Sequence, residues 1–225
     1  NLTLEPIAAI GLAIPESYRM LNIALIDVGA GTSDISITKD GAIIAFGMIP
    51  IAGDAITEVV AKHCLVDFAA AEKIKRHVGD SEKISYKDIM GLDQTVSSKE
   101  IIEVTTPVVD DMTKRVSDKI KELNGGKPVS AVFVVGGGGR LSGYTVALAQ
   151  KLGIQKERVA VRGKEVMQNV VFPEGAKEPD SLLVTPIGIA LSFYDQSNNF
   201  IFVSFNGKRV KLYDNGNLAV IDAAL

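Results

Sequence analysis

Asp27 is the residue of this sequence best placed to do chemistry. It stands near the end of an apolar run, residues 22–28, and the small residues Gly29, Ala30, Gly31 and Thr32 follow it. Such a turn lets backbone N–H groups approach an anion closely, and a carboxylate beside it can hold hydrated Mg²⁺. The hydroxyls of Thr32 and Ser33 add groups that can reach phosphate oxygens. The pattern indicates a site for nucleotide phosphates, with an ordinary tight turn as the alternative.

Four consecutive glycines, Gly136, Gly137, Gly138 and Gly139, form a second candidate site with Arg140. They follow a buried strand and precede a helix, so a flat or anionic ligand could approach their backbone near a positive helix terminus. The spacing fits neither the dinucleotide fingerprint nor the lysine-containing phosphate loop. The alternatives are a flexible loop for the glycines and a solvated surface position for Arg140, whose guanidinium could instead stack on a base.

Glu72 and Lys75 are a third candidate pair. Three residues apart in a helical pattern, they share one face of the helix. Taken alone, the pair predicts an exposed ion pair on a solvated surface.

Composition excludes several classes of protein. The chain has 225 residues with a net charge of -3, which argues against nucleic acid or an anionic membrane as the main partner. The single Cys64 excludes a disulfide framework and a cysteine-rich metal site. Neither an apolar run long enough to span a membrane nor the basic start of a signal peptide is found, so we expect a cytoplasmic protein.

The elements that must position these residues alternate between strands and helices. Apolar runs and alternation predict a helix over 4–14 and strands over 22–28, 33–39 and 42–49, with the last two joined at Asp40-Gly41. The next helices begin at Gly53 and after Asp67, and the polar stretch 80–97 is expected to be irregular.

The second half follows the same alternation. A long helix starts at Ser97 and runs to about Leu123, bent or broken near Pro107. A buried strand over 129–135, a helix over 142–152, a short strand over 159–161 and an apolar helix or helix pair over 181–195 come next. Two Asn-Gly turns in the tail predict a small β-meander.

Together these motifs resemble the actin-like ATPase superfamily. Residues 27–34 resemble its second phosphate loop, residues 134–143 its adenosine loop, and residues 71–75 the helix whose Glu and Lys reach the ribose and base. Residues 185–190 resemble its second connecting helix. Within the superfamily, Leu4-Glu-Pro-Ile-Ala-Ala and Gly53-Asp-Ala-Ile-Thr are most similar to the bacterial cell-division protein FtsA, with the pilus-assembly protein PilM as the nearest rival.

The resemblance implies an α/β fold with a mixed sheet, the ribonuclease H-like lobe of an actin-type ATPase. We expect the lobe over 1–55 plus 125–196, an inserted helical subdomain over 56–124, and the β-meander tail over 197–225 as the start of a separate module. The residues before Asn22 are too few for the family's first lobe, so the chain resembles the second lobe only.

The resemblance also implies the function. ATP and Mg²⁺ would bind, with Asp27 orienting the metal through water and the amides of residues 29–32 holding the β- and γ-phosphates. The loop 136–140 would hold the adenosine, with Glu72 and Lys75 on the ribose and base. No catalytic residue is expected in this segment, and we expect at most weak ATPase activity, requiring the first lobe.

ATP would then act as a clamp that controls polymerisation or partner binding. The implied partners are that missing N-terminal lobe, further copies of the protein, or a cell-division or pilus protein, with membrane contact only indirect, at the inner face through partners. A PilM-like adaptor that has lost nucleotide use and a chaperone-like reactivating ATPase are the alternatives. Ala30, where the family often has glycine, favours the adaptor because its methyl group could crowd a phosphate.

Overall fold

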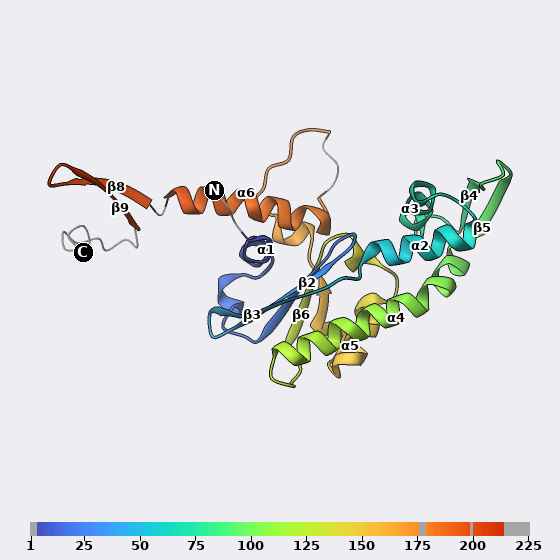
Figure 1. The fold of residues 1–225 in the computed structure, drawn as a ribbon, viewed down its shortest axis with the longest axis horizontal. Helices are drawn as coiled ribbons and strands as arrows, with labels where there is room; N and C mark the ends of the chain where they lie inside the picture. Colours follow the sequence, from blue (N-terminus) through green and yellow to red (C-terminus); the bar gives the residue numbers. More distant parts are fainter. Residues whose placement is uncertain (1–3, 176–178, 199, 214–225) are drawn as a thin grey trace.

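A five-stranded mixed sheet forms the centre of the chain (Figure 1). The computed structural model describes residues 4–175, 179–198 and 200–213. The strand order is β3-β2-β1-β6-β7. The strands are β1 (Ile23–Val28), β2 (Ser33–Lys39), β3 (Ala42–Ile49), β6 (Ala131–Val135) and β7 (Val159–Val161). β1, β2 and β3 pair antiparallel, whereas β6 pairs parallel with both β1 and β7. The predicted α/β class and the three antiparallel strands around the glycine turn are confirmed.

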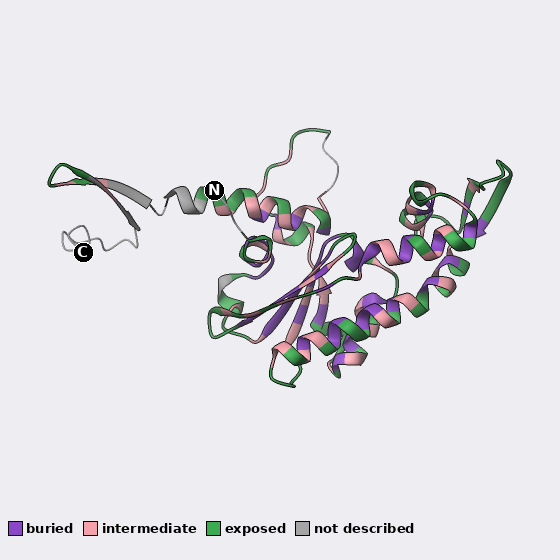
Figure 2. Ribbon diagram, viewed as in Figure 1, coloured by how far each residue is buried: buried purple, intermediate pink, exposed green. Residues whose placement is uncertain are grey.

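Helices cover both faces of the sheet. α1 (Glu5–Ala13) and α6 (Val184–Asn198) pack on one face, and α4 (Ser98–Leu123) and α5 (Tyr144–Leu152) on the other. Side chains along β1 alternate between the two faces of the sheet. Ile23 and Leu25 pack in the core under α1 and α6, and the core under α4 and α5 contains Ala24, Ile26 and Val28. Figure 2 shows that the buried residues concentrate in the sheet and on the helix faces turned toward it.

A third cluster of buried residues lies outside the sheet, in the segment that the sequence predicts to be an insertion. It is built from α2 (Gly53–Cys64), α3 (Phe68–His77) and a small hairpin of β4 (Lys83–Lys87) and β5 (Asp93–Ser97), together with the start of α4. Cys64 is buried in this cluster. The Asp67 side chain caps α3 by accepting a hydrogen bond from the Ala70 amide, as predicted.

Two predictions about this region are wrong. The stretch 80–97 is not irregular, because β4 and β5 pair over five residues each, with Ile84 and Val96 on the buried side. The helix predicted to bend or break at Pro107 runs unbroken from Ser98 to Leu123, so the predicted break is wrong, whereas the bend stays a prediction. Pro107 lies on its exposed side, where water can satisfy the carbonyl that loses its amide partner.

The remaining elements follow the predictions closely. Short 3₁₀ turns occupy Glu16–Tyr18, Gly138–Arg140, Lys156–Arg158, Lys164–Val166 and Ser181–Leu183. The tail forms a hairpin of β8 (Phe200–Phe205) and β9 (Lys208–Tyr213), turned at Asn206-Gly207, both with positive φ. The third strand of the predicted meander lies outside the described residues. Among the described residues, no helix is both long and apolar enough to cross a bilayer.

Candidate functional site

The turn after Asp27 presents backbone amides that have no hydrogen-bond acceptor among the described residues. The Gly29 amide donates to the Thr32 carbonyl (3.0 Å), but among the described residues the amides of Ala30, Gly31 and Thr32 donate no hydrogen bond. Ala30 and Gly31 are exposed. Four amides were expected to bind phosphate, and three of them have no acceptor among the described residues.

Helix α2 fixes the direction in which these amides point. The carbonyls of Gly29 and Ala30 accept hydrogen bonds from the Gly53 and Asp54 amides, at 3.1 and 2.8 Å. In a trans peptide the C=O of one residue and the N–H of the next point in opposite directions. The N–H groups of Ala30 and Gly31 are therefore turned away from α2, side by side, as an anion-binding turn requires.

The side chains of the turn are less available than its backbone. Ser33 is fully buried, and its hydroxyl donates to the Ile51 carbonyl at 2.8 Å, so the expectation that it reaches a phosphate is wrong. The Thr32 hydroxyl donates to Asp34 Oδ2 at 3.3 Å. A Cβ at Gly31 would meet no atom within 4 Å, so packing of the chain does not require glycine there.

Asp27 is half-buried at the end of β1, between two other elements. Its Oδ2 accepts a hydrogen bond of 2.6 Å from the Thr185 hydroxyl on α6, and its Oδ1 lies against Gly136. Burial raises the pKa of Asp27, and the charges of Asp34 and Glu5 raise it further, against the lowering effect of the Thr185 hydrogen bond.

Three carboxylates surround a small void at this point. Glu5, Asp27 and Asp34 line it, and its volume of about 10 Å³ is close to that needed for one water molecule. Among the described residues, no group of three or more His, Cys, Asp or Glu side chains is arranged to hold a metal ion directly. A void of this size beside carboxylate oxygens can hold one water of a hydrated Mg²⁺ ion. The sequence does not indicate Glu5, since its approach to Asp27 depends on how α1 packs.

Three of the four glycines, Gly136, Gly138 and Gly139, are required by packing. Gly136 has φ +80°, and a Cβ there would lie 2.5 Å from the Val28 carbonyl oxygen and closer still to Asp27 Oδ1. A Cβ at Gly138 would collide with the Val28 side chain, and one at Gly139 would lie 2.5 Å from Val134 Cγ1. The loop is thus pressed against β1 and β6. Gly137 is exposed, and Arg140 is exposed and paired with Asp180 at 3.1 Å.

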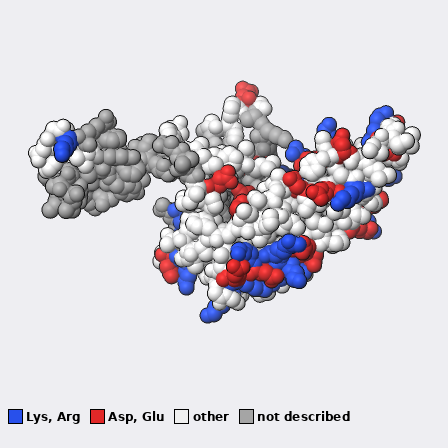
Figure 3. Space-filling view, in the orientation of Figure 1, with Lys and Arg blue, Asp and Glu red and all other residues white. Residues whose placement is uncertain are grey.

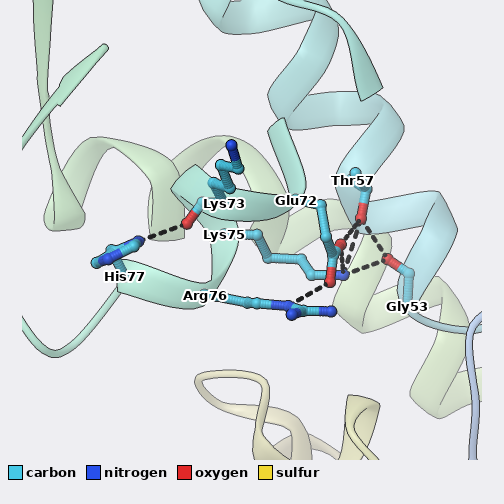
Figure 4. A network of polar contacts seen from close by, with 7 residues as sticks. All are labelled: Gly53, Thr57, Glu72, Lys73, Lys75, Arg76 and His77. Atoms are coloured by element: carbon cyan, nitrogen blue, oxygen red, sulfur yellow. Dashed lines mark hydrogen bonds and ion pairs between the residues drawn. The ribbon is translucent and has the colours of Figure 1, made fainter. Parts of the chain in front are cut away.

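Glu72 and Lys75 form the centre of a polar network at the start of α2 (Figure 4). Their side chains are 2.6 Å apart, and both contact the buried Thr57 hydroxyl, at 2.7 and 2.8 Å. Lys75 Nζ also donates to the Gly53 carbonyl at 3.1 Å. Burial alone would raise the pKa of Glu72, but the hydrogen bonds from Lys75, Thr57 and Arg76 outweigh it and lower the pKa. Glu72 and Lys75 therefore belong to a partly buried polar network and do not form the exposed surface ion pair that their spacing alone predicts.

Gly53 joins this network to the phosphate turn. A Cβ on Gly53 would lie 3.2 Å from the Gly29 carbonyl oxygen and 3.5 Å from Lys75 Nζ. Asp27 in turn touches Gly136. The structure therefore brings the turn, Lys75 and the glycine loop together, whereas the Arg140 side chain is held by Asp180.

A separate groove of about 520 Å³ lies on the other side of α3. Its lining includes Lys73, His77, Lys83, Tyr86 and Lys87 around an apolar floor with Ile74. Figure 4 shows His77 on the side of α3 away from Lys75. Figure 3 shows that side chains of both charges gather at this end of the molecule and over α4. The α4 surface includes the pairs Arg115–Asp111, Lys119–Glu122 and Lys151–Asp110.

Comparison with known proteins agrees with this geometry. The family "Cell division protein FtsA" matches residues 24–181, more than half of the chain. FtsA of Neisseria meningitidis serogroup B is 32% identical over 158 residues, which are 70% of this chain and 33% of that protein. The chain spans less than half the length of the FtsA relatives that it matches.

Solved structures share the fold. The ethanolamine utilization protein EutJ of Carboxydothermus hydrogenoformans is 27% identical with a TM-score of 0.57, covering 83% of this chain and 53% of that one. MreB 5 of Spiroplasma citri bound to AMPPNP is 20% identical with a TM-score of 0.64, covering 87% and 59%. The PilM–PilN type IV pilus biogenesis complex is 18% identical with a TM-score of 0.63, covering 85% and 52%.

The mixed sheet, the phosphate-type turn and the glycine loop pressed against it define a lobe of the actin-like ATPase superfamily. Within that superfamily, the chain belongs to the cell division protein FtsA family.

Proposed function

We propose that this chain is the ATP-binding second lobe of an FtsA-family protein and that Mg-ATP acts there as a clamp between lobes. The observation that carries the proposal is the turn after Asp27. Its Ala30 and Gly31 amides have no acceptor in the part of the chain that the structure describes, and they are exposed and turned away from α2 by two hydrogen bonds. Three unpaired amides beside a carboxylate fit the β- and γ-phosphates of a nucleotide.

Each residue around the turn has a defined task in this proposal. The amides of Ala30, Gly31 and Thr32 bind phosphate oxygens, and Asp27 orients the waters of Mg²⁺. The metal, when bound, neutralises phosphate charge. Lys75 and Glu72 contact the ribose and base from the α3 side, and the loop 136–140 supports the adenosine from the other. Arg140 must break its ion pair with Asp180 to stack on a base. Breaking the pair costs little stability, because the Arg140 side chain is mostly exposed to solvent.

The lobe alone is not expected to turn over ATP. Closure needs a second surface against the phosphates, and the γ-phosphate would control lobe closure and hence self-association or partner binding. The name of one structural neighbour, MreB 5 bound to AMPPNP, supports nucleotide use in this fold.

Calorimetric titration of the full-length protein with Mg-ATP tests the proposal. We expect saturable binding that Asp27→Ala weakens strongly. Asp93→Ala, which removes a mostly exposed carboxylate at the start of β5 and outside the candidate site, is the matched control and should bind as the wild type does. An absence of binding heat at millimolar Mg-ATP would contradict the proposal.

The groove beside α3 favours a second candidate function, that of an adaptor without nucleotide use. Lys73, Lys83 and Lys87 around an apolar floor fit an acidic peptide with interspersed apolar residues. The PilM–PilN complex, whose name records a protein partner, shares the fold. A labelled acidic peptide should then bind more tightly than a basic peptide of equal length, and Lys73→Glu with Lys83→Glu should abolish the difference. Equal affinities of the two peptides for the wild-type protein would exclude this use of the groove.

A further inference from the structure

Thr185 connects α6 directly to the candidate phosphate site. It lies in the first turn of α6, and its hydroxyl donates to Asp27 Oδ2 at 2.6 Å. The other carboxylate oxygen, Oδ1, lies against Gly136. The carboxylate of Asp27 is thus held in one orientation by two elements that are distant from β1 in the sequence.

The segment just before Thr185 holds the glycine loop as well. The Gly136 amide donates to the Ser181 carbonyl at 3.0 Å, and the Ser181 hydroxyl donates back to the Gly136 carbonyl at 2.9 Å. Ser181 is buried. Asp180 binds Arg140 at 3.1 Å. Residues 180–185 therefore contact both candidate nucleotide-binding loops.

Helix α6 is also tightly fixed to α1. A Cβ at Gly188 would collide with the Ala8 carbonyl group, so the two helix backbones are in close contact there. The chain continues from α6 into the β8–β9 hairpin, which Figure 1 shows projecting from the body at the end of α6. Thr185 and the β8–β9 hairpin thus lie at opposite ends of α6.

We propose that Thr185 is a positioning residue for Asp27, and that it couples the start of α6 to occupancy of the phosphate site. The hydroxyl holds the carboxylate beside the void that Asp27 lines, which has room for one water of a hydrated Mg²⁺ ion. Coupling is reciprocal, so a nucleotide that uses the positioned carboxylate must in turn stabilise the start of α6. The proposal rests on the proposed function, because it assumes that Mg-nucleotide binds beside Asp27.

Affinity measurements on the full-length protein test the positioning role. We expect Thr185→Val to weaken Mg-ATP binding by about tenfold, the loss expected for one hydrogen bond to a charged group. Thr185→Ser, which keeps the hydroxyl, should restore the affinity. Binding of ATP in EDTA should be equal in all variants, since Asp27 acts through the metal. An unchanged affinity of Thr185→Val, or an equal loss in EDTA, would overturn the role.

Hydrogen exchange over residues 182–194 tests the coupling. Mg-ATP should slow exchange of this segment in the wild type and have a smaller effect in Thr185→Val. Ser192→Ala is the matched control, because the Ser192 hydroxyl binds the Ile189 carbonyl on the same helix and makes no contact with Asp27. Equal protection by Mg-ATP in the wild type and Thr185→Val would overturn the coupling.

The nucleotide-free protein separates this inference from the proposed function. If the wild type binds no Mg-ATP, the proposed function fails. Thr185→Val must nevertheless speed exchange of residues 182–194 severalfold relative to Ser192→Ala, because it removes the bond between α6 and Asp27. Unchanged exchange in the nucleotide-free protein would overturn the link itself.

Discussion

Replacing Gly136 by alanine should damage the site through a contact that the structure identifies. A Cβ there would lie 2.5 Å from the carbonyl oxygen of Val28 and 2.9 Å from its carbonyl carbon. Both distances are shorter than the 3.4 Å at which ordinary van der Waals contacts of a Cβ begin. It would also collide with Asp27 Oδ1. The residue has φ +80°, so alanine adds backbone strain to the collision.

The magnitude follows from these two causes. The left-handed backbone costs a non-glycine residue about 1–2 kcal/mol, and overpacking adds about 1–3 kcal/mol. We expect Gly136→Ala to lower the free energy of unfolding by about 2–5 kcal/mol. Gly143→Ala is the matched control, because Gly143 has φ +78° but a Cβ there would meet nothing within 4 Å. It should cost only the strain of about 1–2 kcal/mol.

Urea denaturation followed by circular dichroism measures both variants under the same conditions. If Gly136→Ala were no more destabilising than Gly143→Ala, the close packing of the glycine loop on β1 would be refuted. The position of Asp27 that depends on this packing would be refuted with it.

Four further predictions concern the site. Asp27→Asn should raise the urea midpoint at pH 7 while abolishing Mg-ATP binding, because burial raises the pKa of Asp27 and so disfavours its charged form; a lower midpoint would contradict this. Gly31→Val should weaken Mg-ATP binding severalfold yet change stability by less than about 0.5 kcal/mol, as denaturation and calorimetry can show, because only a ligand needs the space. Lys75→Met should destabilise the chain at pH 7, and the difference in free energy of unfolding from wild type should shrink in urea titrations as pH falls below 4.5. The pKa of Glu72 is lowered from 4.5 in the folded chain, so the stability that its charged form contributes is present above pH 4.5 and is lost as pH falls through the lowered pKa. Arg140→Ala should leave stability within about 0.5 kcal/mol but weaken Mg-ATP binding by about threefold to tenfold in calorimetry.

Local patterns were sufficient to predict most of the fold. The alternation of residues 33–49 around Asp40-Gly41 predicts the β2–β3 hairpin, and the Asp67 cap predicts the start of α3. The hairpin within 80–97 was missed, because its strands are short, mostly exposed and rich in charged residues. The break at Pro107 was wrongly predicted because the cost of a proline inside a helix depends on whether solvent can reach the neighbouring carbonyl.

The candidate site was predictable in its parts but not in its contacts. The position of Asp27 before a glycine turn can be read locally. The approach of Glu5, the hydrogen bond from Thr185 and the burial of the Ser33 hydroxyl depend on how distant elements pack. The four glycines illustrate the same limit, because a glycine needed by a ligand and one needed by a neighbouring strand look alike in a sequence.

A crystal structure of the full-length protein with Mg-AMPPNP is the most direct test of nucleotide binding at this turn. The β- and γ-phosphate oxygens should lie within hydrogen-bonding distance of the Ala30, Gly31 and Thr32 amides, with waters of Mg²⁺ between the phosphates and Asp27. A nucleotide bound elsewhere, or phosphates out of reach of these three amides, would contradict the account.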